Sequence, residues 1–480
     1  MKLKHMSHVV DPGQADGCGA EQLNRAHPWR LWLWLYVCAL AWYWMLWAIF
    51  NYTIQPDTAG YLEMGRGIFR EFTFGYRLSD GVWQPNACRV PLVPFILGAL
   101  DRLSGDEQIG YFWFSLLQVM LAPLLPCVAF YFGSKAGRAC GWLAYAFLVL
   151  HANIIFAAQL VLTDVLFAVS CAVMFITTWR ALERPGAGKG LIAGLACGAA
   201  LMTRPIMKYY WFVAAALTVL RIRPWRRTAQ LLAAFSAGLA LFAVPWLARN
   251  FIHYREPVFD TFQGICLLWS NWDMVEARDG DSSQTAALKQ WIIRQGRAGS
   301  PMAMVMQHGE DYWKTHDLEV SRELQAVAAE TFCSHPGELA RRWAANFRQL
   351  VISHTHHDEL YQAFLCRPLY RHMRQIGLFP PDVWDRKLFH LTCEVTRAMR
   401  WSYGALAPLG LMLMLARRPT RFLGIFLGLN ILYFCGIISM VVGYDRYRLN
   451  MEPLFAALIA YPLALAVNCI ISLSRHRRFR

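Results

Sequence analysis

Residues 29–50 have the sequence WRLWLWLYVCALAWYWMLWAIF, in which Arg30 is the only charged side chain. As a helix rising about 1.5 Å per residue, this stretch is roughly 33 Å long, enough to cross the hydrocarbon core of a bilayer. A secretory signal peptide is not favoured, because the apolar run starts late, is long for such a signal and lacks a small-residue cleavage pattern. The stretch therefore predicts a first membrane span.

Nine further apolar runs follow it. The composition agrees, because 56% of the 480 residues are hydrophobic and only 16% are charged, against about 25% charged residues in average soluble domains. The ten runs are 29–50, 107–132, 139–158, 163–179, 190–203, 206–220, 229–248, 402–416, 422–442 and 452–473. The sequence predicts an all-α polytopic membrane protein with about ten transmembrane helices and excludes an ordinary cytosolic enzyme.

The basic residues are distributed unevenly between the two sides of the predicted membrane. The chain has 47 Lys/Arg and 32 Asp/Glu, a formal charge of +15. With a cytoplasmic N-terminus, the cytoplasmic pieces carry 20 Lys/Arg against four acidic residues, and the remainder is nearly neutral. Those pieces are 1–30, 133–139, 180–190, 221–228, 416–421 and 474–480. Since cytoplasmic loops are enriched in Lys and Arg, we expect both termini in the cytoplasm, with anionic membrane lipids and not nucleic acid as partners of this charge.

Four regions follow along the chain. Residues 1–28 are polar and expected to be cytoplasmic and disordered. Residues 29–250 form a membrane domain of about seven spans, whose first extracytoplasmic loop is 51–106, and residues 401–480 form the last three spans and a basic cytoplasmic tail. Residues 251–400 are too polar to span a membrane and too long for a structureless loop. They predict a mainly helical extracytoplasmic domain with two apolar helix faces, Val320, Leu324, Val327 and Ala328 in one helix and Leu339, Trp343, Phe347 and Leu350 in another.

Cysteine and histidine residues give no firm site. Of the 13 cysteines, those expected outside the membrane could form one or two disulfides in an oxidising space, but their pairing is not deducible. They are Cys88, Cys266, Cys333, Cys366 and Cys393. A polar cluster of His354, His356, His357 and Asp358 fits known metal-ligand spacings poorly and favours a solvated turn. We therefore expect no metal site from these residues.

Two carboxylates lie where apolar runs meet the extracytoplasmic side. Pro56 ends the first run and is well placed to begin another helix, with Asp57 in its first turn. Asp164 opens the fourth run, where it could either cap the helix or serve as a second functional carboxylate. Ionisable residues at membrane level are costly and usually functional, which favours Asp57 as a reactive group over a simple helix-start residue.

Five basic residues lie at the same level, on the side where positive charge is disfavoured. Arg204 and Lys208 follow the fifth run, although Lys208 could simply extend towards the interface, and Arg249 follows the seventh. Arg446 and Arg448 precede the last run and would share one side if that stretch were extended. Because the guanidinium fork matches phosphate oxygens, these residues are candidate ligands for an anionic phosphate.

Six segments in a fixed order carry a resemblance to a known family. They are PDTAGYLEMGRGI (56–68), RVPLVPFILGAL (89–100), LTDVLF (162–167), GLACGAALMTRP (194–205), PWLARNFIHYREPVF (245–259) and RYRLNMEPLFAAL (446–458). In this order the chain resembles the GT-C class of membrane glycosyltransferases, in particular the branch of the protein O-mannosyltransferases and the lipid A aminoarabinose transferase. Residues 260–400 carry no specific match.

The resemblance implies a transferase that takes a sugar from a polyprenyl-phosphate carrier on the non-cytoplasmic face and inverts the anomeric centre. It implies Asp57 as the general base and Asp164 as a second acidic position, with Arg204, Lys208, Arg249, Arg446 and Arg448 available to the donor phosphate. The family often has an Asp-Glu pair in the first loop, whereas Thr58 follows Asp57 here. That departure weakens a two-carboxylate metal site, and dependence on a divalent cation stays open.

The acceptor could be lipid A, another glycan or a protein, and the sugar a hexose or a pentose. The expected location is a bacterial inner membrane. One alternative is a transporter or flippase for a lipid-linked or amphipathic substrate. A transporter would place ionisable residues near the middle of spans and show an inverted repeat, whereas the polar residues here gather at span ends. Another alternative is a non-catalytic membrane scaffold whose large domain binds a partner, which would leave the positions of Asp57 and the arginine pair unexplained.

Overall fold

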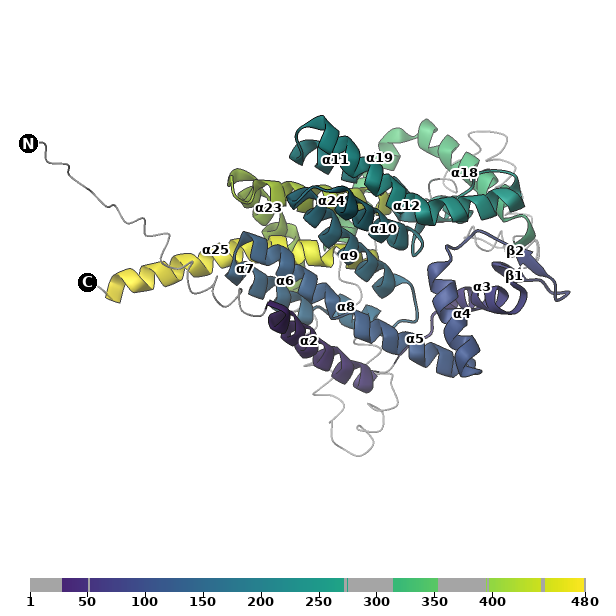
Figure 1. The fold of residues 1–480 in the computed structure, drawn as a ribbon, viewed down its shortest axis with the longest axis horizontal. Coiled ribbons are helices and arrows are strands. Elements are labelled where there is room, and N and C mark those ends of the chain that lie inside the picture. Colours follow the sequence, from purple (N-terminus) through teal and green to yellow (C-terminus); the bar gives the residue numbers. More distant parts are fainter. Residues whose placement is uncertain are drawn as a thin grey trace, which may run out of the picture.

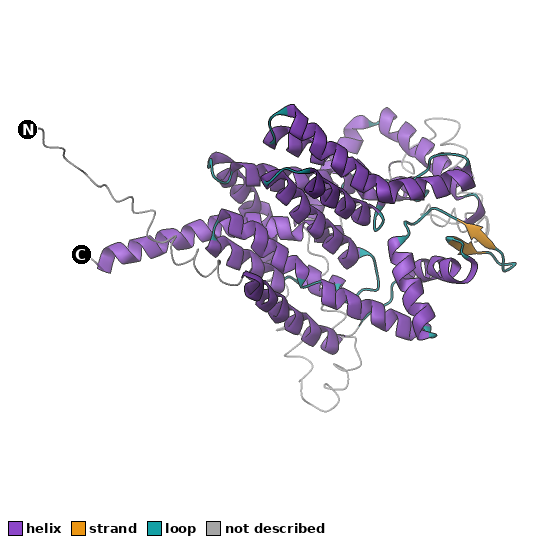
Figure 2. Ribbon diagram, in the orientation of Figure 1, coloured by secondary structure: helices purple, strands orange, loops and turns teal. Residues whose placement is uncertain are grey.

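The computed structural model describes residues 28–50, 52–271, 274, 314–352, 394, 397–441 and 445–478. Within these ranges the secondary structure is almost entirely helical, and the one sheet is a short hairpin (Figure 2). Its strand β1 (Gly75–Arg77) pairs antiparallel with β2 (Trp83–Pro85). The predicted all-α class is confirmed, with this hairpin as a local addition.

Among the described residues, six segments are long and apolar enough to cross a membrane. They are α2 (Pro28–Phe50), α5 with α6 (Glu107–Leu121, Leu124–Ala136), α9 (Asp164–Glu183), α12 (Trp225–Tyr254), α24 (Arg421–Ile438), and η3 with α25 (Asp445–Met451, Glu452–Arg478). The other four predicted spans contain shorter helices. These are α7 with α8 (Arg138–Val149, Ala152–Ala157), α10 (Ala187–Leu201), η1 with α11 (Pro205–Tyr209, Tyr210–Arg221), and η2 with α23 (Ser402–Leu406, Ala407–Ala416). The chain is an integral membrane protein in which every predicted apolar run contains a helix.

The chain leaves α2, α10 and α12, and enters α9 and α25, at one end of the helix bundle, which we call the loop end. The first loop lies there as α3 (Pro56–Glu71), the hairpin and α4 (Leu92–Ser104). In Figure 1 the loop end is at the right, while α25 extends to the opposite side. A backbone hydrogen bond from Leu92 N to Met202 O (3.0 Å) ties the start of α4 to the end of α10.

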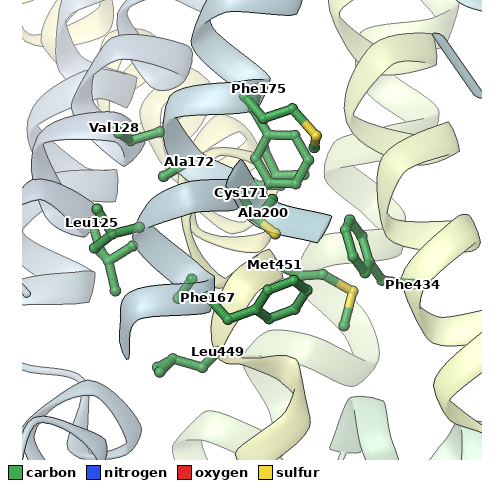
Figure 3. Packing of buried hydrophobic residues seen from close by; sticks show 14 of the residues in the cluster. Leu125, Val128, Phe167, Cys171, Ala172, Phe175, Ala200, Phe434, Leu449 and Met451 are labelled. Atoms are coloured by element: carbon green, nitrogen blue, oxygen red, sulfur yellow. The ribbon is translucent and has the colours of Figure 1, made fainter. Parts of the chain in front are cut away.

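Helix α9 lies at the centre of the bundle, and most of its side chains are buried. Figure 3 shows Leu125 and Val128 of α6 on one side of it and Phe434 of α24 on the other. Phe167 packs edge-on against Phe434, with ring centroids 6.2 Å apart. The start of α9, where Asp164 lies, is therefore held by rigid packing.

A glycine row brings α10 against α12. A Cβ at Gly194 would lie 2.0 Å from Phe235 O, and one at Gly190 would lie 2.7 Å from Leu231 O. Small residues spaced by four allow membrane helices to approach backbone to backbone. This contact fixes α10, and with it Arg204 just beyond its end.

Two helices of the predicted extracytoplasmic domain lie at the loop end, α18 (Asp317–Ser334) and α19 (Pro336–Ile352). The predicted face of α18 is confirmed, because all four of its residues are buried. It packs against α13 (Gln263–Ser270), where a Cβ at Gly264 would lie 2.1 Å from Ser321 O. In α19, Trp343 Nε1 donates to Gly436 O (2.9 Å) at the end of α24. The expected disorder of 1–28 falls on residues outside the described ranges except for Pro28, and so do 275–313 and 353–393 of this domain.

Candidate active site

Helix α3 begins at Pro56 as predicted, with Asp57 in its first turn. The preceding residue Gln55 has an extended backbone, and its N–H donates to Thr58 Oγ1 (3.1 Å). Proline is favoured at this position because it has no N–H to leave unpaired. Asp57 therefore projects from a fixed helix start at the loop end.

A short parallel pairing places that helix start beside the start of α9. Thr53 N donates to Gln159 O (2.8 Å), and Val161 N donates to Thr53 O (3.1 Å). Thr58 Oγ1, which is buried, donates to Val161 O (2.7 Å). Thr58 thus fastens α3 to the segment leading into α9.

Asp57 forms an ion pair with Arg89, at 3.0 Å between Oδ1 and Nη2. The Asp57 side chain is 50% exposed and that of Arg89 is 18% exposed. The guanidinium lies over the rings of Tyr61 and Phe262, at 4.9 Å and 4.4 Å from their centroids. Arg89 was not among the predicted site residues, although an arginine in the loop expected to be extracytoplasmic, where positive charge is disfavoured, was an available signal.

Asp164 lies at the centre of a second group. Its side chain is 1% exposed, and Oδ1 accepts from Arg204 Nη2 at 2.6 Å, while Oδ2 lies 4.0 Å from Arg446 Nε. Arg204 also donates from Nε and Nη2 to Thr163 Oγ1 (2.9 and 2.7 Å). Thr163 and not Asp164 is the N-cap residue of α9. Of the two roles left open for Asp164, capping therefore does not describe it, and its carboxylate faces two arginines instead.

The two groups lie close together, because Thr58, next to Asp57, donates to the carbonyl of Val161, three residues before Asp164. Burial raises the pKa of Tyr61, the charges of Asp57 and Asp164 raise it further, and Arg89 and Arg204 oppose them. Arg446 likewise interacts with Asp164 and, more weakly, with Asp57. The structure therefore brings together Asp57, Asp164, Arg204 and Arg446 of the predicted site and adds Arg89; we call these five residues the carboxylate–arginine cluster.

Lys208 lies at one margin, in η1 after Arg204. Its Nζ donates to Gln263 Oε1 (2.5 Å) and lies 3.4 Å from Asp260 Oδ2. The lysine thus pairs with the segment leading into α13, which also carries the Phe262 ring that covers Arg89.

Arg249, near the end of α12, binds protein oxygens. Its Nη1 donates to Asn86 O (3.1 Å) and Asn250 Oδ1 (2.8 Å), and its Nη2 donates to Phe74 O. The guanidinium also lies over the Trp246 ring. These contacts tie α12 to both sides of the hairpin, so Arg249 acts in this structure as a brace of the first loop.

Arg448 is fully buried and is separated from Arg446. The expectation that both arginines share one side required an extended backbone, but Asp445–Met451 is a 3₁₀ helix, in which positions two apart diverge. Arg448 Nε donates to Glu452 Oε1 (2.8 Å), and Nη1 donates to the carbonyls of Leu350 and Val351 (2.8 and 2.7 Å) at the end of α19. This arginine therefore fastens α19 to the start of α25.

The face of the Tyr403 ring lies 4.0 Å from the Arg448 guanidinium carbon, and its hydroxyl donates to Glu452. The hydroxyl is also 2.9 Å from His151 Nε2. All four side chains of this network are fully buried. A buried charge is tolerated only when it is paired and hydrogen-bonded, and this network provides such pairing for Arg448 and Glu452.

The structure describes only some of the residues considered above for disulfides and for a metal site. Cys88, Cys266 and Cys333 have free thiols, whereas Cys366, Cys393 and the His354, His356, His357 and Asp358 cluster lie outside the described ranges. Within those ranges, no group of three or more His, Cys, Asp and Glu side chains could hold a metal ion.

No protein-family model and no curated protein matches the sequence. Among solved structures, ArnT from Cupriavidus metallidurans bound to undecaprenyl phosphate is 13% identical, with a TM-score of 0.37, covering 90% of this chain and 78% of that one. The oligosaccharyltransferase AglB from Archaeoglobus fulgidus, in complex with an inhibitory peptide and a dolichol-phosphate, is 12% identical, with a TM-score of 0.49. That match covers 95% of this chain and 52% of AglB.

A second structure of the Archaeoglobus fulgidus oligosaccharyltransferase, tethered to an acceptor peptide, is 12% identical, with a TM-score of 0.48. That match covers 96% of this chain and 51% of the oligosaccharyltransferase, so this chain spans about half its length. The chain is thus similar to ArnT and to the archaeal oligosaccharyltransferase over at least 90% of its own length.

Proposed function

We propose that this protein is a glycosyltransferase that moves a hexosyl or pentosyl group from a polyprenyl-phosphate-linked donor to a glycan, lipid or protein acceptor. The observation that carries the proposal is the carboxylate–arginine cluster. It draws two acidic and three basic residues from separate segments to one end of the membrane helices. Ionisable groups gathered at membrane level on one side suit chemistry on a lipid-linked phosphate.

Asp57 is the base in this proposal. The acceptor O–H or N–H bond breaks and its proton passes to the Asp57 carboxylate, while the acceptor atom bonds to the anomeric carbon. The anomeric C–O bond breaks with its electron pair going to the lipid phosphate, which inverts the anomeric centre in one displacement. Asp57 suits the role because half of its side chain is exposed, so an acceptor can reach it, and a positioned base accelerates such a step about 10²- to 10⁴-fold.

Arg204 and Arg446 are the donor-phosphate ligands in this proposal. Buried Asp164 holds both guanidinium groups at the loop end, and preorganised cations stabilise charge that develops on a leaving phosphate. Lys208 is a further ligand candidate at the margin. Arg249 and Arg448 bind protein oxygens, and we assign them the scaffold and not the phosphate.

The loop end faces away from the cytoplasm in this proposal, and the membrane is a bacterial inner membrane. The support is the charge distribution, because the pieces at the opposite end carry most of the Lys/Arg excess. The isoprenoid tail of the donor would lie between membrane helices, with its phosphate at headgroup level beside the cluster.

The test is a comparison of cell-envelope glycans and glycoproteins, by mass spectrometry, with and without this protein. We expect one sugar to disappear from a defined acceptor when the protein is deleted, to return with the wild-type gene and to stay absent with Asp57→Asn. The purified protein should then transfer that sugar from its polyprenyl phosphate. An unchanged glycan profile on deletion, together with no transfer in vitro, would refute the proposal.

A further inference from the structure

Asp317, the first residue of α18, is a buried carboxylate outside the carboxylate–arginine cluster. Its Oδ2 accepts three hydrogen bonds, from Ala87 N (3.1 Å), Tyr254 Oη (2.7 Å) and Thr261 Oγ1 (2.7 Å). The residue is 5% exposed. One oxygen atom thus joins the first loop, the end of α12, the segment before α13 and the start of α18.

Two of the three segments that donate to Asp317 hold Arg89 in place. Ala87 precedes Arg89 by two residues, and Thr261 precedes Phe262, whose ring lies 4.4 Å from the Arg89 guanidinium carbon. Thr261 N also donates to Ala87 O (3.0 Å). Asp317 therefore binds, through one oxygen atom, both the segment that carries Arg89 and the segment whose Phe262 ring covers Arg89.

The third segment adds a charge requirement. Tyr254 and Arg249 both lie near the end of α12, and Asp317 interacts electrostatically with the partly buried Arg249 guanidinium. An ionised acceptor forms shorter and stronger hydrogen bonds than a neutral one, and the start of a helix favours a negative charge. A carboxylate therefore suits these three donors and Arg249 better than an amide of the same shape.

We infer that Asp317 is a positioning residue, which holds segments 87–89 and 261–262 together so that Arg89 meets Asp57. The inference rests on the proposed function, in which Asp57 is the base. It also gives α18 a part in the reaction. This helix of the predicted extracytoplasmic domain then sets the geometry of the Asp57–Arg89 pair, which lies in the first loop. Asp317 acts through Arg89 and touches neither the donor nor the acceptor.

Three variants weaken the hydrogen bonding of Asp317 to different degrees, and we call them the grip variants. Thr261→Val and Tyr254→Phe each remove one donor and keep the carboxylate, and Asp317→Asn removes the charge. Arg322→Gln is the matched control, because Arg322 lies on the same helix and pairs with Glu256 at the surface. We expect the grip variants to lower kcat about 10- to 100-fold, as a small misplacement of a reacting pair can. KM for the donor should change little, and the control should match the wild type.

A double-mutant cycle separates positioning from a general loss of stability. Thr261→Val is measured in the wild-type background and again in Arg89→Gln. If Asp317 acts through Arg89, the effect of Thr261→Val on kcat disappears once Arg89 is gone, because residues acting through a shared partner are not additive. The same fold loss in both backgrounds would overturn the inference.

Cys88 gives a readout that needs no activity. It lies between Ala87 and Arg89, it is buried, and burial raises the pKa of its thiol to about 12, so maleimide reacts with it slowly at neutral pH. Loss of a hydrogen bond to a charged group should open this segment roughly tenfold more often. We expect Cys88 labelling, followed by peptide mass spectrometry, to accelerate in Thr261→Val and Asp317→Asn but not in Arg322→Gln.

The two readouts separate failure of the inference from failure of the proposed function. If the wild-type protein transfers no sugar, the proposed function fails, and Cys88 labelling alone decides whether Asp317 holds segment 87–89. If the wild type is active and the grip variants keep full kcat, or lose kcat while Cys88 stays protected, the positioning role of Asp317 is overturned.

Discussion

Asp57→Asn separates the chemistry of the site from its stability. Asparagine has the shape of aspartate and its Oδ1 can still accept the hydrogen bond from Arg89, but it cannot take the proton of the acceptor. Loss of a general base lowers the rate about 10²- to 10⁴-fold, which corresponds to about 3–5 kcal/mol in the activation barrier. We expect kcat to fall by this factor while the donor binds with nearly unchanged affinity.

The same change should have little effect on the free energy of unfolding. The Asp57 side chain is 50% exposed and its ion pair with Arg89 is partly solvated, and such pairs contribute about 0–1 kcal/mol to folding. The expected loss in the free energy of unfolding is therefore several times smaller than the rise in the activation barrier.

The assay is single-turnover transfer by the purified protein in lipid nanodiscs, read by mass spectrometry of the product, with thermal unfolding of the same sample. Glu71→Gln is the matched control, because Glu71 is an exposed carboxylate at the opposite end of α3. A folded Asp57→Asn protein that retains the wild-type kcat would refute the assignment of the base. So would an equal loss in Glu71→Gln.

Four further predictions test the surroundings of the site. Asp164→Asn should lower the free energy of unfolding by about 3 kcal/mol or more, because the Asp164 side chain is only 1% exposed and its charge compensates both Arg204 and Arg446. A change of about 1 kcal/mol or less in thermal unfolding, the contribution of an exposed pair, would contradict this. Gly194→Ala should cost about 1–3 kcal/mol, since its Cβ would meet a carbonyl of α12 at 2.0 Å, whereas Gly188→Ala, with open space around it, should be tolerated and serves as its control. Arg448→Met should destabilise the protein by about 3–5 kcal/mol by leaving a buried carboxylate unpaired, with donor affinity intact in the folded fraction by titration calorimetry; a selective loss of donor binding would restore Arg448 as a phosphate ligand. Removal of divalent cations with EDTA should leave transfer rates unchanged, because arginines already compensate both site carboxylates, and a loss restored by added Mg²⁺ would show that a cation takes part.

Local features of the sequence predict part of the fold. The apolar runs predict which segments enter the membrane, because the length and hydrophobicity of a run are properties of consecutive residues. The start of α3 at Pro56 follows from the same local chemistry, since proline fixes its own backbone and removes an N–H. The buried face of α18 follows from the helical repeat of its apolar residues.

The partners of the charged side chains depended on packing. Arg89 and Asp57 are 32 positions apart, and Asp164 and Arg204 are 40 apart. Whether such groups meet depends on the register between helices, which is set by contacts such as Gly194 against α12 and by the pairing of Thr53 with the segment before α9. The four-residue spacing of the glycines marks a face of α10 that can pack closely, but it does not say which helix meets that face.

The last arginine pair shows the division most clearly. The amino-acid pattern predicts that Arg446 and Arg448 lie at the loop end, because they directly precede an apolar run. The pairing of Arg446 with Asp164 and of Arg448 with Glu452 depends on how the chain packs. The reason is that the connecting turn is a 3₁₀ helix and not an extended strand, and that the carbonyls of α19 accept hydrogen bonds from the buried Arg448 guanidinium.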